Sequence, residues 1–339
     1  MPRIAIALGD PAGIGLEVVL KAIKQIRHEN TNFDPLLVGC RHWLEQSYTQ
    51  LSAHSKTCLA SPFELDVLHI PLDYSVVPGS ANSKTGAASF NWLTAATAAV
   101  LQGKCNTLCT APISKHAWHA AGHRYPGQTE RLAELCGGSD AAMLFTARSP
   151  HNGWRFNTLL ATTHIPLGKV SETLNTKLLN KRLNQLHNFC LRFNESPKLA
   201  VAGLNPHAGE EGELGSEEQE WIKPLLDKLR SQTKRGGLGF KLDGPLPPDS
   251  CWLGASKAWH NPNTTRSIPE AIDGYLALYH DQGLIPTKLL AFDQAVNTTL
   301  GLPFLRTSPD HGTAFDIAGR GIARAESMVA AINTALELG

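Results

Sequence analysis

Residues 3–15 read RIAIALGDPAGIG. The run from Ile4 to Leu8 is apolar at every position and has the length of one strand that is buried on both faces. A glycine-rich loop, residues 9–15, follows at once and leads into helix-like apolar spacing over residues 15–28. A buried strand joined by a tight loop to a helix is how a parallel α/β sheet begins, and this stretch predicts that fold class.

The same alternation continues through most of the chain. Further strands are expected at 35–39, 65–70, 106–110, 141–146, 157–163, 198–204 and 275–279, with the first at 3–8. Helices are expected at 15–28, 85–102, 129–136, 171–193, 216–229 and 323–338. We therefore predict an α/β protein with mainly parallel sheets. A chain of 339 residues exceeds the usual size of a single core, and because no Ser/Gly linker interrupts it, we expect the chain to cross a domain boundary more than once.

Composition excludes several classes of function. The net charge is +1 and the basic residues are scattered, which argues against a nucleic-acid partner. The amino-terminal apolar run is far too short for a signal peptide or a membrane span, so no membrane partner is expected. The seven cysteines include no C-x-x-C pair and indicate reduced, structural thiols. These features together favour a cytoplasmic protein.

Three histidines stand at or just beyond expected strand ends: His164, His207 and His280. Ligands of open α/β sheets bind beyond the carboxyl ends of the strands, so the three imidazoles could meet there. Three protein ligands and an open position are typical of a catalytic divalent metal. The chain has 14 histidines, however, and position alone favours ordinary capping or solvent-facing roles over metal binding.

Two other segments suggest anion binding. The glycines of the 9–15 loop permit close approach of a ligand, but the loop matches neither G-x-G-x-x-G nor a P-loop, and a tight turn without ligand stays open. Lys288, Asn297 and Arg306 flank residues 298–303, and two cations with an amide suit a phosphate or carboxylate.

Six strings, taken together, resemble the 4-hydroxythreonine-4-phosphate dehydrogenase family over essentially the whole chain. They are GDPAGIG at 9–15, TAPISK at 110–115, NPHAGE at 205–210, GPLPPD at 244–249, YHDQG at 279–283 and NTTLGLP at 297–303. The resemblance implies a bilobal α/β/α fold like that of isocitrate and isopropylmalate dehydrogenases. It implies one lobe from residues 1–115 with 270–339 and a second from 116–269, with the active cleft between them and at a homodimer interface.

The resemblance also implies the site residues. The divalent metal (zinc, magnesium, cobalt or manganese) would lie on His164, His207 and His280, with Asp281 or Asp249 orienting a ligand or relaying a proton. The substrate contacts would be Gln128, Thr129, Lys288, Asn297 and Arg306. One of them departs from the family, which usually has Gly-His-Thr-Glu where this chain has GQTE at 127–130. Glutamine cannot exchange a proton near neutral pH, which removes any acid–base role of that histidine.

A wider resemblance concerns the cofactor. Residues 311–319, HGTAFDIAG, are similar to the His-Gly-Ser-Ala-Pro-Asp-Ile-Ala-Gly loop that holds the adenosine half of the cofactor in isopropylmalate and isocitrate dehydrogenases. The resemblance implies NAD (or NADP) at His311, Gly312, Thr313, Ala314 and Asp316. The alternative is that Asp316 caps the start of a helix.

The reaction that the resemblance implies is oxidation of 4-phosphooxy-L-threonine by NAD with loss of CO2. The product would be 3-amino-2-oxopropyl phosphate, a precursor in pyridoxal 5′-phosphate biosynthesis. Three alternatives stay open: a paralogous dehydrogenase for 4-phospho-threonate or -erythronate, an enzyme like the phosphate acyltransferases, and a non-catalytic protein that binds phosphorylated metabolites.

Overall fold

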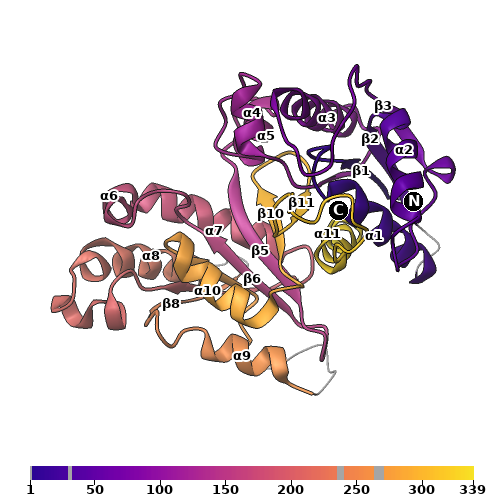
Figure 1. Cartoon of the computed structure of the whole chain (residues 1–339). Helices are drawn as coiled ribbons and strands as arrows, with labels where there is room; N and C mark the ends of the chain where they lie inside the picture. Colours follow the sequence, from indigo (N-terminus) through magenta and orange to yellow (C-terminus); the bar gives the residue numbers. More distant parts are fainter. Residues whose placement is uncertain (1, 30–32, 235–239, 263–270) are drawn as a thin grey trace. The chain divides into compact units, whose positions relative to one another are not determined.

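The structure is a computed structural model that describes residues 2–29, 33–234, 240–262 and 271–339. The chain forms two compact units (Figure 1). Unit 1 contains Met1–Ala141 and Val296–Gly339, and unit 2 contains Ala142–Ala295. The chain therefore leaves unit 1 once and returns to it.

Unit 1 is built on a sheet with the strand order β3-β2-β1-β4-β11-β10. The first five of these strands are parallel, and β10 runs antiparallel to β11. Its strands are β1 (Arg3–Ala7), β2 (Asp34–Gly39), β3 (Asp66–His69), β4 (Thr107–Thr110), β10 (Val296–Leu300) and β11 (Arg306–Pro309). Its helices are α1 (Gly15–Glu29), α2 (Arg41–Ser52), η1 (Pro62–Glu64), α3 (Ser83–Leu101), α4 (Lys115–Ala120), α5 (Gln128–Leu135) and α11 (Glu326–Leu338).

The core of unit 1 explains the apolar opening of the sequence. Ile4, Ala5, Ile6 and Ala7 alternate between the two faces of the sheet, and all four are buried. Helix α3 packs against β1, β2 and β4, while α11 packs against β4, β10, β11 and helix α1. Asn82 caps α3 by accepting hydrogen bonds from the amides of Lys84 and Thr85.

Unit 2 has the strand order β5-β6-β9-β7-β8. β5 (Ala142–Arg148) and β6 (Arg155–Leu160) form an antiparallel hairpin, and β6, β9 (Gly274–Ala277), β7 (Lys198–Ala202) and β8 (Lys241–Leu246) are parallel. Its helices are η2 (Leu167–Lys169), α6 (Val170–Thr173), α7 (Thr176–Cys190), η3 (Pro206–Gly212), the π-helical turn η4 (Glu218–Ile222), α8 (Lys223–Lys234), α9 (Leu253–His260) and α10 (His280–Ala291). The carboxyl ends of β6, β9 and β7 therefore lie side by side.

The predicted fold class is confirmed, and all eight expected strands are present within a few residues of their expected bounds. The expected helix 171–193 is wrong in one respect: it is interrupted after Thr173, because Asn175 caps a new helix by accepting from the amide of Leu178 at 2.9 Å. The two units divide the chain at 141/142 and 295/296, whereas the lobes were expected to divide it at 115/116 and 269/270. Helices α4 and α5 pack against α3, and β9 pairs with β6 and β7, which explains the units.

All seven cysteines are free. Among the described residues, no helix combines the length and the hydropathy that crossing a membrane requires.

Candidate active site

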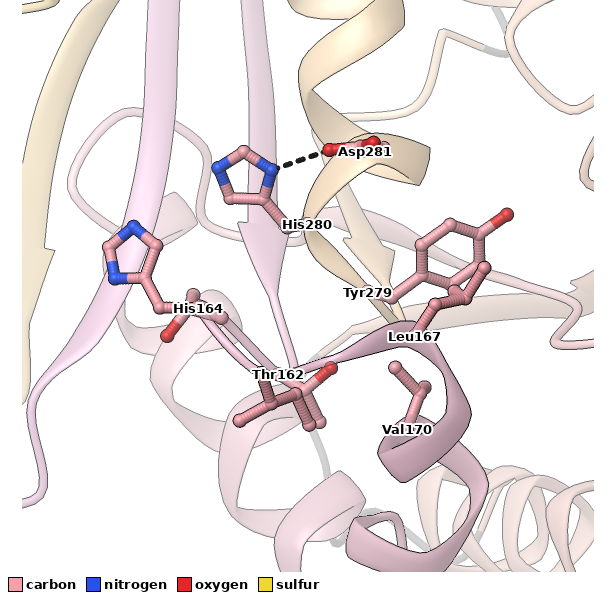
Figure 2. Close-up of a pocket in the computed structure, with 9 residues that line it drawn as sticks. Thr162, His164, Leu167, Val170, Tyr279, His280 and Asp281 are labelled. Atoms are coloured by element: carbon pink, nitrogen blue, oxygen red, sulfur yellow. Dashed lines mark hydrogen bonds and ion pairs between the residues drawn. The ribbon is translucent and has the colours of Figure 1, made fainter.

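The carboxyl ends of β6 and β9 bring two of the predicted histidines together. Leu160 and Ala277 are partners in the parallel register, and the hydroxyl of Thr162 donates to the carbonyl of Leu278 at 2.7 Å. His164 lies four residues beyond β6, and His280 is the first residue of α10. Their ring centroids are 5.7 Å apart, with an angle of 41° between the planes. Both rings line one cavity of about 260 Å³ (Figure 2).

His207 follows the neighbouring strand, β7, and lines an adjacent cavity of about 610 Å³ that also includes Asp249. The two cavities have Tyr279 and Asp281 in common. Within the described ranges, no three side chains of the metal-binding kinds form one group. The structure thus brings His164 and His280 together and places His207 in the next cavity.

The segment that carries His207 is a left-handed turn. Residues 207–211 have φ values of 53°, 58°, 86°, 38° and 55°, although only one of them is glycine. L-residues avoid this conformation, and a run of them persists only where the surroundings hold it. His164 has a positive φ as well, at 42°. Backbone strain therefore accompanies two of the three histidines.

Carboxylates orient two of the imidazoles. Nδ1 of His280 is 2.7 Å from Oδ1 of Asp281 (Figure 2), and Nδ1 of His207 bonds Oε1 of Glu210. Because a carboxylate only accepts, each Nδ1 donates to its carboxylate, and the Nε2 of each ring is the nitrogen that can bind a metal. Histidines that bind metals are held in this way, so the donor set fits a divalent ion.

Two buried side chains that the sequence did not single out hold these loops in place. Gln282 accepts from the amide of Leu278 and donates to the carbonyl of Gly203, both at 2.6 Å, and so joins the ends of β9 and β7. Glu218, which is fully buried, accepts from the amides of Leu204 and Asn205 at 2.6 and 2.8 Å, just before the left-handed turn. Gln282 and Gly203 are 79 residues apart, and Glu218 lies 13 and 14 residues from its two amide partners, so hydrophobic periodicity carries no signal for these contacts.

A second group of predicted residues lies in unit 1, around the carboxyl end of β4. Arg306 is 3% exposed, and its guanidinium donates to the hydroxyls of Thr110, at 2.7 and 3.1 Å, and Thr299, at 3.2 Å. No carboxylate of the described residues lies within ion-pair distance of it. Burial lowers the pKa of Arg306 to about 10, partly opposed by the charges of Cys109 and Glu130. A buried cation without a counter-ion is suited to bind an anion.

Two buried amide oxygens belong to the same unit. Nε2 of Gln128, the first residue of α5, donates to the carbonyl of Ala111 at 3.2 Å, and its Oε1 is buried with no partner. Oδ1 of Asn297 is also buried without a partner. Thr129 is half-buried beside Gln128. Lys288 lies in unit 2, on α10, with its ammonium 5.1 Å from the ring centroid of Phe292.

The expected cofactor loop, residues 311–319, packs against the 9–15 loop within unit 1. The amide of Ile14 donates to the carbonyl of Thr313 at 3.0 Å, and a side chain at Gly13 would collide with Thr313. Side chains at Gly9 and Gly15 would likewise collide with the backbones of Pro112 and Leu8. The glycines of the 9–15 loop therefore permit loop packing, which favours the tight turn over a binding loop.

The alternative role for Asp316 is wrong: Asp316 lies in a turn, and the next helix, α11, begins ten residues later. Gly312 and Asp316 are exposed, while Thr313 and Ala314 are half-buried. Nδ1 of His311 is 3.0 Å from the carbonyl of Gly312, and its Nε2 is buried without a partner. The Nε2 of His311, which has no partner, and the empty space beside Gly312 fit a bound nucleotide.

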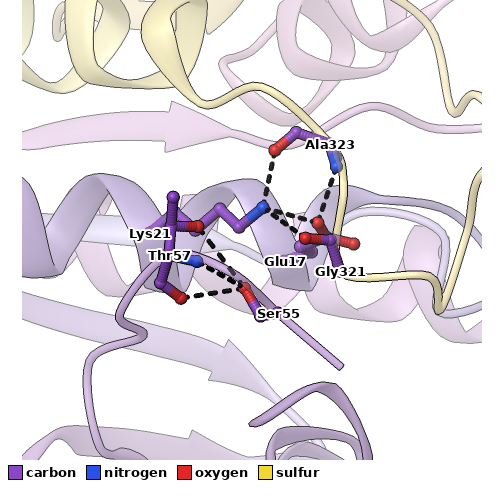
Figure 3. A network of polar contacts seen from close by, with 6 residues as sticks. All are labelled: Glu17, Lys21, Ser55, Thr57, Gly321 and Ala323. Carbon is purple, nitrogen blue, oxygen red and sulfur yellow. Dashed lines mark hydrogen bonds and ion pairs between the residues drawn. The ribbon is translucent and has the colours of Figure 1, made fainter. Parts of the chain in front are cut away.

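A buried ion pair holds the chain just after this loop. Lys21 donates to Glu17 at 2.8 Å and to the carbonyls of Gly321 and Ala323 at 3.0 and 2.7 Å (Figure 3). Glu17 in turn accepts from the amide of Ala323 at 2.7 Å. Ile14, just before helix α1, thus contacts the loop at Thr313, and Lys21, within α1, holds the chain just after the loop.

Comparison with known proteins shows which family the chain is similar to. Residues 23–335 match the family model described as pyridoxal phosphate biosynthetic protein PdxA. A 4-hydroxythreonine-4-phosphate dehydrogenase from Synechococcus sp. (strain RCC307) is 62% identical over the full length of both chains. A D-threonate 4-phosphate dehydrogenase from Pectobacterium atrosepticum is 36% identical, over 99% of this chain and 98% of its own.

Solved structures agree. The crystal structure of 4-hydroxythreonine-4-phosphate dehydrogenase from Klebsiella pneumoniae superposes with a TM-score of 0.80 at 34% identity, covering 99% of this chain and 98% of that one. The chain therefore belongs to the pyridoxal phosphate biosynthetic protein PdxA family, whose 4-hydroxythreonine-4-phosphate dehydrogenases are oxidoreductases that act on a CH–OH group.

Proposed function

We propose that this protein oxidises 4-phosphooxy-L-threonine with NAD in pyridoxal 5′-phosphate biosynthesis. The secondary alcohol loses a hydride to NAD and a proton to solvent, and the resulting 3-oxo acid releases CO2 and takes up a proton to give 3-amino-2-oxopropyl phosphate. The observation that carries this proposal is the 62% identity, over the full length of both chains, with a relative of that name.

The residues that would hold the divalent metal are His164, His207 and His280, the last two through the Nε2 atoms that do not face Glu210 and Asp281. The chemistry that zinc, magnesium, cobalt or manganese supplies when bound there is that of a Lewis acid: a lower pKa for an alcohol and polarisation of a carbonyl. Asp281 and Glu210 keep the imidazoles in one tautomer, and the left-handed turn fixes where His207 stands.

The chain's other groups orient the reactants. Arg306 would bind the phosphate or the carboxylate of the substrate, because its buried charge has no counter-ion among the described residues. Lys288 would supply a second cation, and Thr129, Asn297 and Gln128 would bind polar groups. The loop 311–319, including His311, Gly312, Thr313, Ala314 and Asp316, would bind the adenosine half of NAD or NADP, and Asp249 would support the His207 cavity.

We further propose that the protein is a homodimer. Ile285, Leu289 and Phe292 form one stripe along α10 at helical spacing, with 60%, 82% and 68% of each residue exposed. Ile285 and Leu289 line the His207 cavity, so a second copy that covered the stripe would also close the site. Leu289→Glu should convert a dimer to a monomer in light scattering; a wild-type monomer at enzyme concentrations would contradict the proposal.

The principal alternative is oxidation of 4-phospho-threonate, which the Pectobacterium relative's name favours. NADH formation with 4-phosphooxy-L-threonine and with the threonate analogue, each with and without a chelator, tests both. Turnover of the amino acid substrate that stops with chelator and returns with metal supports the proposed function. Turnover of the threonate alone, or of neither substrate, would reject it.

A further inference from the structure

Unit 1 contains a cavity of about 780 Å³ that the proposed function does not use. Its walls come from three segments: the second half of α1, residues 56–58 after α2, and residues 321–326 before α11. It shares no residue with the loops 9–15 and 311–319. Lys24, on its α1 wall, lies about 15 Å along the helix from Ile14, where α1 meets the proposed cofactor loop. The volume is typical of a small-molecule site.

Contacts between the three segments fix the walls. The amide of Ala60 donates to the carbonyl of Leu20 on α1 at 3.0 Å, and a side chain at Gly321 would collide with the backbone of Ser55. Lys21 joins α1 to residues 321–323 through two backbone carbonyls (Figure 3). The cavity is therefore preformed, which lowers the cost of binding a ligand in it.

The lining of this cavity is basic. Lys24 and His28 lie one turn apart on α1, and Lys56 belongs to the second wall. Arg324, in the third wall, bonds Glu326 at 3.3 Å, so the two lysines give the cavity its net charge. Neither lysine has an ion-pair partner among the described residues. Basic residues near the end of α1 complement the helix dipole, but this reason does not apply to Lys56.

We propose that this cavity binds a phosphorylated small molecule that carries an apolar ring, in addition to the substrate and cofactor of the proposed function. Lys24 and Lys56 would bind the phosphate through charge-assisted hydrogen bonds. Ile322, which lines the same cavity, is 56% exposed, and a ring attached to the phosphate would cover it. A mononucleotide and a phosphorylated pyridine share this chemistry.

Cys58 lines the cavity, and it is the one exposed cysteine of the seven, so its reactivity reports whether the cavity is filled. The test measures the rate at which iodoacetamide alkylates Cys58, by mass spectrometry, in the metal-replete enzyme with saturating NAD. Adenosine monophosphate or pyridoxine 5′-phosphate should slow this rate at least roughly fivefold when bound, and the one that acts at the lower concentration identifies the ring. Inorganic phosphate lacks the ring and should need roughly tenfold higher concentration.

The double variant Lys24→Gln/Lys56→Gln should raise the protecting concentration roughly tenfold or more, because both charged donors are lost. Lys104→Gln, which changes an exposed lysine outside the cavity, is the matched control and should behave like the wild type. Failure of both ring compounds to protect Cys58, or equal protection in the double variant, would overturn the proposal. Equal protection by inorganic phosphate would indicate an adventitious ion only, and protection by NAD alone would make the cavity part of the cofactor site; either result would also overturn it.

Discussion

Replacing Arg306 with Met should separate ligand binding from stability. The side chain is buried in β11, bonds only threonine hydroxyls and has no carboxylate within ion-pair distance among the described residues. Methionine is apolar and similar in length, so it removes the charge without opening a large cavity. We expect the variant to lose anion binding while its free energy of unfolding hardly changes.

The magnitude follows from the pKa. Burial lowers the pKa of Arg306 well below its ordinary value, to about 10, which corresponds to about 3 kcal/mol against the charged form in the folded protein. The hydrogen bonds to Thr110 and Thr299 return about 1 kcal/mol each, so the substitution should change the free energy of unfolding by less than about 2 kcal/mol. Losing the charged partner of a bound phosphate should cost about 2–5 kcal/mol of binding, roughly 30-fold or more in Kd.

The sign of the pH dependence adds a check. The pKa of Arg306 is lower in the folded state than in the unfolded state, so its charge destabilises the fold at lower pH, and this penalty disappears only as the pH rises above about 10. The difference in unfolding free energy between wild type and Arg306→Met should therefore be constant between about pH 6 and 9.

Calorimetry with inorganic phosphate and with the substrate measures affinity, and chemical denaturation measures stability. Arg155→Met is a matched control: Arg155 is a second buried arginine, its pKa is lowered to about 9 by burial, and it lies on β6 in unit 2. The control should affect stability alone. If Arg306→Met kept wild-type affinity for phosphate and substrate and lost several kcal/mol of stability, Arg306 would be a structural residue and the reasoning would be refuted.

Three further substitutions test the other parts of the site. Gln128→His should change kcat less than about tenfold, because the proposed role is hydrogen bonding; a hundredfold gain with a new ionisation near pH 6–7 in the rate profile would mean that the site lacks a proton-transfer group. Asp316→Ala should raise the Kd for NAD and spare that for the phosphorylated substrate, whereas two unchanged values in calorimetry would exclude the 311–319 loop as the cofactor site. Glu218→Gln should weaken binding of Zn²⁺ or Co²⁺ about tenfold and change the Co²⁺ absorption spectrum, because it loosens the turn that carries His207. Glu220→Gln, which removes an exposed charge nearby, is the control. Equal affinities in wild type and both variants would contradict a role of Glu218 in positioning His207.

Much of the sheet was predictable because its strands are apolar on both faces, as β1 is. β10 and β11 were missed for a physical reason: they read VNTTL and RTSP, and their polar side chains are largely buried. Arg306 donates a hydrogen bond to the hydroxyl of Thr299 across the strand pair, which offsets the cost of burying both polar groups. This bond forms only when the strands pair, so the sequence shows no hydrophobic pattern there. Periodicity therefore overlooked the two strands that carry the proposed anion-binding residues Asn297 and Arg306, as it overlooked β8, which reads KLDGPL.

The candidate site was predictable only in part for a similar reason. That His164 and His280 would approach each other follows from the rule that parallel strands end at one edge of the sheet, once β6 and β9 are neighbours. The order β6-β9-β7 and the left-handed backbone at His207 depend on contacts such as those of Gln282 and Glu218, which join segments distant in sequence. No short sequence pattern reveals the strand order or this backbone conformation.

The glycines at 9, 13 and 15 affect what a match to this loop says about a related protein. Each is required because the backbone or side chain of another segment occupies the space of its Cβ: Pro112, Thr313 and Leu8 respectively. Selection for folding alone would preserve these three glycines, even in a descendant that had lost its substrate or the proposed metal-binding histidines. The three glycines are thus a marker of architecture, and their presence in a related protein would not by itself indicate a retained activity.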